Sequence, residues 1–288
     1  MTDKKISVVL PVYNEEGSIK EVVQQLKKVM LSTKLEHEVI VVNDGSTDST
    51  RKILEKEKGI ILINNPYNLG YSASLKKGIK AAKFPWILML DADGTYPIEK
   101  IPNLVKHMGN YDMVVGARIG KNVHIPFIRR PAKFILTKMA EFLTRKKIPD
   151  LNSGMRLFKK EIAMQFLNLF PSGFSFTTTI TLACLTNDYT VKFVPIDYMK
   201  RKGKSTVHPI KDFVNFNKII FKMALYFEPL KFFLWPGSLM ILSGICIGIY
   251  KVLSGIKTLG TTTTLLILTG VLICFLGLLA EMIVKNRK

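Results

Sequence analysis

Residues 6–31, which read ISVVLPVYNEEGSIKEVVQQLKKVML, decide the fold of this chain. They begin with a short apolar run, Ile6–Val12, and then pass through a polar turn. The stretch that follows carries apolar residues at helical spacing: Ile19, Val22, Val23 and Leu26. A buried strand followed by an amphipathic helix is the repeating unit of α/β proteins. The sequence therefore predicts that the chain begins with a strand–turn–helix unit.

The same alternation of short apolar runs and helical patterns continues to Ala117. Further strands are expected at Val39–Asn43, Ile60–Ile63, Trp86–Leu90 and Met113–Val115. Helices are expected at Glu15–Leu31, Thr47–Lys56, Ser72–Ala82 and Ile98–His107. This alternation predicts the α/β class, with a Rossmann-like, mostly parallel sheet flanked by helices on both faces. Such sheets bind ligands beyond the carboxyl ends of their strands.

Two long uncharged runs, Phe232–Tyr250 and Thr261–Ala280, lie near the C-terminus. A helix that crosses a bilayer needs about 20 predominantly apolar residues, so both runs are long enough. We expect a transmembrane hairpin with helices at about 232–250 and 261–284, and its surface is a candidate for self-association. The alternative is a pair of buried core helices. Because Lys and Arg are more frequent outside the hairpin than in its connection, both termini are expected in the cytoplasm.

The charge of the chain is strongly basic, with 42 Lys and Arg against 22 Asp and Glu and a net charge of +20. Such a balance favours anionic partners: nucleotides, nucleic acid or an acidic membrane surface. Two basic amphipathic segments, 124–147 and 207–230, are candidates for helices in the membrane interface, and the alternative is ordinary surface helices. We therefore expect a cytoplasmic catalytic domain over 1–206, an interfacial helix over 207–230 and the hairpin over 231–288.

The strongest chemical signal is Leu90-Asp91-Ala92-Asp93-Gly94, where a hydrophobic strand ends in two carboxylates. Side chains two residues apart on an extended strand project to the same side. Their hard oxygens suit Mg²⁺ or Mn²⁺ bridging a diphosphate, although solvated aspartates at a strand end are the alternative. The turns after the first two strands bring Glu15 and Asp44 to the same edge. Four carboxylates there would repel one another unless a cation or a hydroxyl-rich ligand uses them.

Five motifs together carry a resemblance to a known family: PVYNEE (11–16), NDGSTDST (43–50), NLGYSAS (68–74), DADGTYP (91–97) and DLNSGMRLF (150–158). They resemble the family 2 glycosyltransferases, which have the GT-A fold. Within that family the chain is similar to the polyprenyl-phosphate branch, such as dolichol-phosphate mannosyltransferases and bactoprenol glucosyltransferases. The resemblance implies an integral membrane enzyme. It would move a hexose, with inversion, from a GDP- or UDP-sugar to dolichyl or undecaprenyl phosphate.

The resemblance also implies roles for single residues. The donor nucleoside would be held by Pro11, Tyr13, Glu15 and Asp44, and the metal and donor diphosphate by Asp91 and Asp93. A basic loop over the donor would contribute Arg201 and Lys204. The acceptor phosphate would be bound by Arg118, Arg129 and Lys133, which makes Asp91, Asp93 and Arg118 the catalytic set. Ser153 and Arg156, in the turn that begins at Asp150, would support the site.

Two positions depart from the family pattern and leave the donor sugar open. Tyr71 stands where many relatives carry a basic residue, and Thr95 where mannosyl members often carry glutamine. One alternative function is a membrane transferase that extends a polysaccharide or glycolipid hydroxyl, although the chain has no QxxRW sequence. Another is a non-catalytic membrane adaptor or a nucleic-acid-binding protein. The intact aspartate pair and the lack of an aromatic–basic nucleic-acid motif argue against it, so no nucleic-acid partner is expected.

Overall fold

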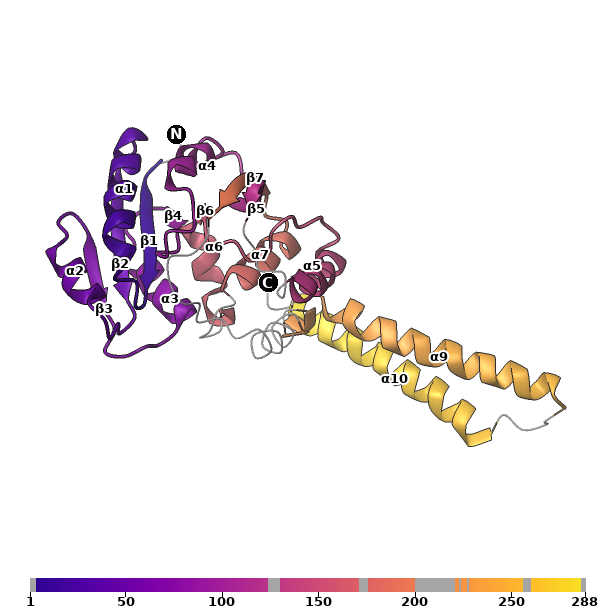
Figure 1. Ribbon diagram of the computed structural model, residues 1–288. Helices are drawn as coiled ribbons and strands as arrows, with labels where there is room; N and C mark the ends of the chain where they lie inside the picture. Colours follow the sequence, from indigo (N-terminus) through magenta and orange to yellow (C-terminus); the bar gives the residue numbers. More distant parts are fainter. Residues whose placement is uncertain are drawn as a thin grey trace. The chain divides into compact units, whose positions relative to one another are not determined.

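The computed structural model describes residues 4–123, 130–170, 176–199, 221–222, 224–226, 228–255 and 260–285. The chain divides into two compact units, Met1–Phe216 and Asn217–Lys288. The first unit contains a mixed sheet with helices packed against it, and the second contains a pair of long helices (Figure 1).

The sheet of the first unit has seven strands in the order β3-β2-β1-β4-β6-β5-β7. Their bounds are β1 Ile6–Val12, β2 His37–Asn43, β3 Ile61–Asn64, β4 Trp86–Met89, β5 Met113–Val123, β6 Arg156–Lys159 and β7 Val191–Tyr198. β6 is antiparallel to β4 and β5, and the other neighbouring pairs are parallel. The carboxyl ends of β1, β2, β4 and β5 therefore point to one edge of the sheet. The predicted mostly parallel α/β fold is confirmed.

The helices of this unit cover the sheet. Their bounds are α1 Ile19–Ser32, α2 Thr50–Lys56, α3 Tyr71–Ala81, η1 Ile98–Lys100, α4 Ile101–Val105, α5 Arg130–Thr144, α6 Lys160–Gln165, η3 Leu167–Leu169 and α7 Phe176–Thr186. Val8 and Leu10 of β1 belong to the core formed with α1 and α4. Val9, on the other face of β1, lies against Gly78 of α3. Both faces of β1 are therefore buried, which explains why its sequence is apolar at every position except Ser7, whose hydroxyl donates to Glu38 Oε1 at 2.6 Å.

Several boundaries differ from the sequence-based expectation. α1 begins at Ile19 rather than Glu15, because residues 14–18 form a turn that is hydrogen bonded to the next loop. The helix expected at Ile98–His107 is a short 3₁₀ turn, η1, followed by α4, which ends at Val105. β5 extends to Val123 instead of ending at Val115 because it pairs with β7, a strand the sequence pattern did not indicate.

The second unit is a helical hairpin of α9, Pro229–Leu253, and α10, Gly260–Lys285 (Figure 1). Both are long and apolar enough to span a membrane, with mean hydropathies of 1.9 and 2.5. Glycines let the two backbones approach closely: a Cβ on Gly270 would lie 2.7 Å from the carbonyl oxygen of Gly237. A Cβ on Gly244 would lie 2.7 Å from Cγ1 of Ile267. Small residues at such contacts are typical of packed membrane helices. Most of the segment expected as an interfacial helix, 207–230, lies outside the described residues.

Candidate active site

The turns after β1 and β2 are hydrogen bonded to each other across the edge of the sheet. Asn14, which has a φ of 53°, accepts the Thr47 N–H at 2.8 Å and donates its side-chain amide to Thr47 Oγ1 at 3.1 Å. Glu16 accepts the Ser49 N–H at 2.9 Å. The short polar side chains that the sequence places at these strand ends therefore tie the two turns into one surface.

Asp44 follows β2 and holds the loop that precedes α3. Its buried carboxylate accepts hydrogen bonds from Asn65 Nδ2 at 2.8 Å, and from the backbone N–H groups of Leu69 and Gly70, each at 2.9 Å. Gly70 has a φ of 96°, a conformation that glycine adopts at no steric cost. The Asn68-Leu69-Gly70 turn is therefore folded around the carboxylate of Asp44.

Asp91 and Asp93 stand directly after β4, as the sequence predicts. The hydroxyl of Tyr71 donates to Asp91 Oδ1 at 2.6 Å, and Asp93 Oδ1 accepts from the Thr95 hydroxyl at 2.6 Å. Burial, followed by the charge of Asp91, raises the pKa of Tyr71 well above its ordinary value, so the phenol keeps its proton and remains a donor.

Ser18 connects the Glu15 turn to the Asp91–Asp93 loop. Its hydroxyl lies 2.9 Å from the carbonyl oxygen of Ala92 and 3.2 Å from Glu15 Oε2. The structure thus gathers the four carboxylates, Glu15, Asp44, Asp91 and Asp93, along one edge of the sheet. Pro11 is buried within β1, and Tyr13 is half-buried directly after it.

Arg118, on β5, is paired with a buried carboxylate. Its Nε and Nη2 donate to the two oxygens of Asp150 at 2.7 and 2.9 Å, and the guanidinium lies 5.0 Å from the ring centroid of Tyr198. The side chain of Arg118 is 13% exposed and that of Asp150 is fully buried. Burial opposes the charge of Arg118, but electrostatic interaction with Tyr96 and the hydrogen-bonded ion pair with Asp150 hold its pKa above the usual value. The predicted role of Arg118 at an acceptor phosphate stays a prediction.

The turn formed by residues 150–156 is fixed by a fully buried arginine. Arg156 donates to the carbonyl oxygens of Ser153 at 2.6 Å and Leu151 at 2.7 Å, and to the hydroxyl of Thr181 at 2.5 Å. Burial lowers the pKa of Arg156 to about 10, so it remains charged at neutral pH. The hydroxyl of Ser153 donates to the Gly116 carbonyl at 2.5 Å. These contacts hold the turn in place. The predicted supporting role of Ser153 and Arg156 in the active site stays a prediction.

Three of the predicted site residues, Arg129, Arg201 and Lys204, lie outside the described residues, and only the backbone of Lys133 is described. Lys133 belongs to α5, which carries a run of exposed apolar side chains: Phe134, Ile135, Met139 and Phe142. Phe134 is 63% exposed and Phe142 is 53% exposed. An exposed apolar stripe on a basic helix supports the interfacial interpretation of segment 124–147, which stays a prediction.

Asp91 and Asp93 fit a divalent cation by the chemistry of their oxygens and by their neighbours. Both carboxylates accept hydrogen bonds from neutral hydroxyls, which bring no positive charge of their own. Within the described part of the chain, no group of three or more His, Cys, Asp or Glu side chains could hold a metal ion. Mg²⁺ usually binds through one or two carboxylates together with water and substrate phosphates. The pair therefore suits an ion that is shared with a bound diphosphate.

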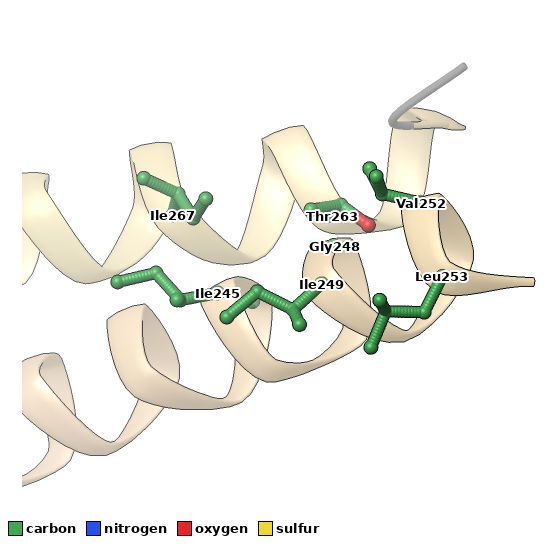
Figure 2. A pocket seen from close by; sticks show the side chains of 8 residues that line it. Ile245, Gly248, Ile249, Val252, Leu253, Thr263 and Ile267 are labelled. Carbon is green, nitrogen blue, oxygen red and sulfur yellow. The ribbon is translucent and has the colours of Figure 1, made fainter. Parts of the chain in front are cut away.

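A hollow in the hairpin has a different character. A groove of about 370 Å³ lies between α9 and α10. Apolar side chains such as Ile245, Ile249 and Ile267 line it (Figure 2). Thr263 is the polar residue in this lining. Because the lining carries no charge, the groove does not suit a nucleotide.

The sequence does not predict several residues that lie around the site. It identifies Tyr71 only as a departure from the family pattern, and it does not indicate a role for Asn65 or Tyr96. Tyr96 accepts the Gly154 N–H at 2.6 Å. The position of Tyr71 directly after a glycine turn is the one sign in the sequence that it could lie at the site. Its partner, Asp91, depends on how α3 and the loop after β4 are placed in the fold.

The family of the chain is shown by comparison with known proteins. The glycosyl transferase family 2 pattern matches residues 7–167, and the GtrB C-terminal hairpin pattern matches residues 228–285. In fold, the chain is similar to glucosyl-3-phosphoglycerate synthase from Mycobacterium tuberculosis, with a TM-score of 0.59 and 18% identity over 77% of this chain and 78% of that one. This confirms the GT-A architecture.

Curated relatives were found among archaeal and bacterial proteins. The chain is 29% identical to a dolichyl-phosphate hexose transferase of Haloferax volcanii, over 76% of this chain and 94% of that protein. It is 32% identical to an undecaprenyl-phosphate 4-deoxy-4-formamido-L-arabinose transferase of Proteus mirabilis, over 55% of this chain and 50% of that protein. A low-salt glycan biosynthesis hexosyltransferase of Haloferax volcanii is 29% identical over 72% of this chain, which spans only 51% of that protein. On its sequence motifs, its fold and the match over residues 7–167, the chain belongs to glycosyl transferase family 2.

Proposed function

We propose that this protein transfers a hexose from a nucleotide sugar to a polyprenyl phosphate, with inversion at the anomeric carbon. The observation that carries the proposal is the presence, in one chain, of a family 2 transferase domain and a GtrB-type hairpin. The relatives named for dolichyl-phosphate and undecaprenyl-phosphate transfer support the same class of acceptor. A membrane hairpin suits an enzyme whose acceptor lies in the bilayer.

The nucleophile in this reaction would be a phosphate oxygen of the lipid. A phosphomonoester has a second pKa of about 6, so this oxygen is already largely ionised at neutral pH and requires no general base. The chain must therefore bring two anions together rather than remove a proton. A divalent cation held by Asp91 and Asp93, Mg²⁺ or Mn²⁺, would neutralise charge developing on the leaving diphosphate. Mn²⁺ and UDP are bound in the synthase of similar fold.

The remaining residues divide into a donor group and an acceptor group. Pro11, Tyr13, Glu15 and Asp44 would line the nucleoside side of the donor, with Arg201 and Lys204 closing over its phosphates. Arg118, Arg129 and Lys133 would orient the acceptor phosphate, because a charge-assisted hydrogen bond to an arginine fixes an anion in place. The catalytic domain and both termini would lie in the cytoplasm, where nucleotide sugars are available.

The proposal predicts that the acceptor must carry a phosphate. Purified protein would be incubated with radiolabelled UDP- and GDP-sugars, Mg²⁺ or Mn²⁺, and either undecaprenyl phosphate or free undecaprenol. We expect label in the organic extract only with the phosphate, and release of that label by mild acid, as for a glycosyl phosphate. Equal transfer to the free alcohol, or label only in a polysaccharide, would favour the hydroxyl-acceptor alternative.

The same assay tests Arg118, with a control that the structure makes necessary. Arg118→Ala alone breaks a buried ion pair with Asp150, which costs about 3–5 kcal/mol of stability. The variant is therefore combined with Asp150→Asn and compared with Asp150→Asn alone. If Arg118 binds the acceptor phosphate, its loss should slow transfer about 10- to 100-fold and leave hydrolysis of the donor by water nearly unchanged. An equal decrease in both rates would remove Arg118 from the acceptor site.

A further inference from the structure

The carboxylate of Asp91 is enclosed by two other segments of the chain. On one side lies Tyr71, the first residue of α3, whose hydroxyl donates to Asp91 Oδ1 at 2.6 Å. On another side lies Gly154, where an added Cβ would overlap the Asp91 carboxyl group. Gly154 is itself held, because its N–H donates to the Tyr96 hydroxyl at 2.6 Å. A carboxylate enclosed in this way has little freedom to rotate.

The position of Tyr71 is fixed by Asp44, so the enclosure extends to the neighbouring strand end. Asp44 binds the N–H groups of Leu69 and Gly70, the two residues directly before Tyr71. Asp44 therefore fixes the position of the loop before α3, and this loop fixes where α3 begins. Tyr71, the first residue of α3, in turn fixes the orientation of the Asp91 carboxylate. Because a phenol is neutral, this contact orients Asp91 without cancelling the charge that attracts a cation. A lysine or arginine at the same place would cancel it.

We propose that Tyr71 is a positioning residue of the donor site, which holds the Asp91 carboxylate in the conformation that binds the divalent cation. The inference rests on the proposed function in assigning Asp91 to the donor diphosphate and its metal. A partner that orients a metal ligand commonly changes metal affinity by a factor of about 10 to 100 when it is removed. An oriented carboxylate also loses less conformational freedom when the ion binds.

The test is a double-mutant cycle on cation binding, measured with Mn²⁺ alone by electron paramagnetic resonance and repeated with UDP and with GDP. Tyr71→Phe should weaken Mn²⁺ binding about 10-fold or more. Tyr189→Phe is the matched control, because Tyr189 also donates one 2.6 Å hydrogen bond, to Gln165, away from the four carboxylates. It should change Mn²⁺ affinity less than about 2-fold.

The cycle separates positioning from a purely structural effect. Asp91→Asn keeps an oxygen that can accept from Tyr71 but loses the charge. If Tyr71 acts through Asp91, the double variant should bind Mn²⁺ as Asp91→Asn does, since nothing remains to be positioned. Wild-type affinity in Tyr71→Phe, defects that add in the double variant, or a wild-type protein that binds no Mn²⁺ would each overturn the inference. A protein with the expected cycle that transfers no sugar to undecaprenyl phosphate would instead refute the proposed function.

Discussion

Asp44 shows how a residue expected to touch the ligand is used by the protein itself. A carboxylate has about four acceptor positions, and three donors from residues 65–70 already occupy Asp44. Its contact with the nucleoside base remains a prediction, but its contact with the loop is in the structure. Arg118 is similar, since two of its nitrogens bind Asp150. At the scale of single residues, the site is a set of charged groups with protein partners already in place.

Metal dependence belongs to this scale, and Asp93 is the residue that tests it. Asp93→Asn keeps the size of the side chain and an oxygen that can accept from Thr95, but it removes the charge. We expect transfer to fall by about 100-fold or more, because the leaving diphosphate loses its counterion. Excess EDTA should have the same effect on the wild-type protein, and added Mn²⁺ should reverse it. As a control, the melting temperature of the variant should be unchanged. Full activity of the wild-type protein in EDTA would contradict the predicted metal dependence.

Among the elements, α3 packs closely on two of the strands that end at the site. A Cβ on Gly78 would lie 2.5 Å from Cγ1 of Val9 and 3.2 Å from Cγ2 of Val42. The absence of a side chain at this position thus lets the helix lie against β1 and β2. Because Tyr71 begins the same helix, the approach of α3 to the sheet also sets the distance between Tyr71 and Asp91.

Gly78→Ala should therefore destabilise the protein, although alanine is normally the better helix former by about 1 kcal/mol. Overpacking of this kind costs about 1–3 kcal/mol. For a domain of this size, we expect the melting temperature of the detergent-solubilised protein to decrease by about 2–10 °C. Gly17→Ala is the control, because a Cβ there meets no atom within 4 Å. An increased melting temperature in Gly78→Ala would contradict the close packing.

The sequence predicted the strands well where each one is buried and continuous. Ile6–Val12 was expected and found without change, because an apolar run that ends in a polar turn has one simple interpretation. The antiparallel strand β6, Arg156–Lys159, was not expected, because its four residues contain two basic side chains. Arg156 is buried only because carbonyl oxygens and Thr181 surround it. Contacts between distant segments, such as Tyr71 with Asp91, leave no periodic pattern in a sequence and could not be predicted.

For the whole molecule, the two units differ in the solvent that they suit. The first buries its apolar side chains in a core, whereas α9 and α10 expose many of theirs, including Leu239, Leu253 and Leu272. The share of residues buried within the protein is only 17% and 11% in the apolar parts of the two helices, which argues against the alternative of two core helices. Their match to the GtrB hairpin supports insertion in a membrane. The predicted boundaries between catalytic domain, interfacial helix and hairpin remain to be tested.

Topology is the prediction that belongs to this scale. Lys and Arg are more frequent outside the hairpin than between its helices, so both termini should face the cytoplasm. A cysteine introduced by Ser254→Cys, at the end of α9, should react with an impermeant thiol reagent added to intact cells. The wild-type protein should remain unlabelled, and so should Lys288→Cys until the cells are broken. Labelling of Lys288→Cys in intact cells would reverse the orientation.

The glycine contacts of the hairpin bear on how the enzyme would treat lipids of different length. Where Gly237 meets Gly270, the two helices leave no room for a hydrocarbon chain to pass between them. An isoprenoid tail of the proposed acceptor would then run along the outside of the pair, in contact with ordinary membrane lipid. A tail held in that way would not have its length limited by a closed tunnel between the described parts of α9 and α10. The enzyme should therefore accept short and long polyprenyl phosphates alike, provided that their headgroups reach the same depth.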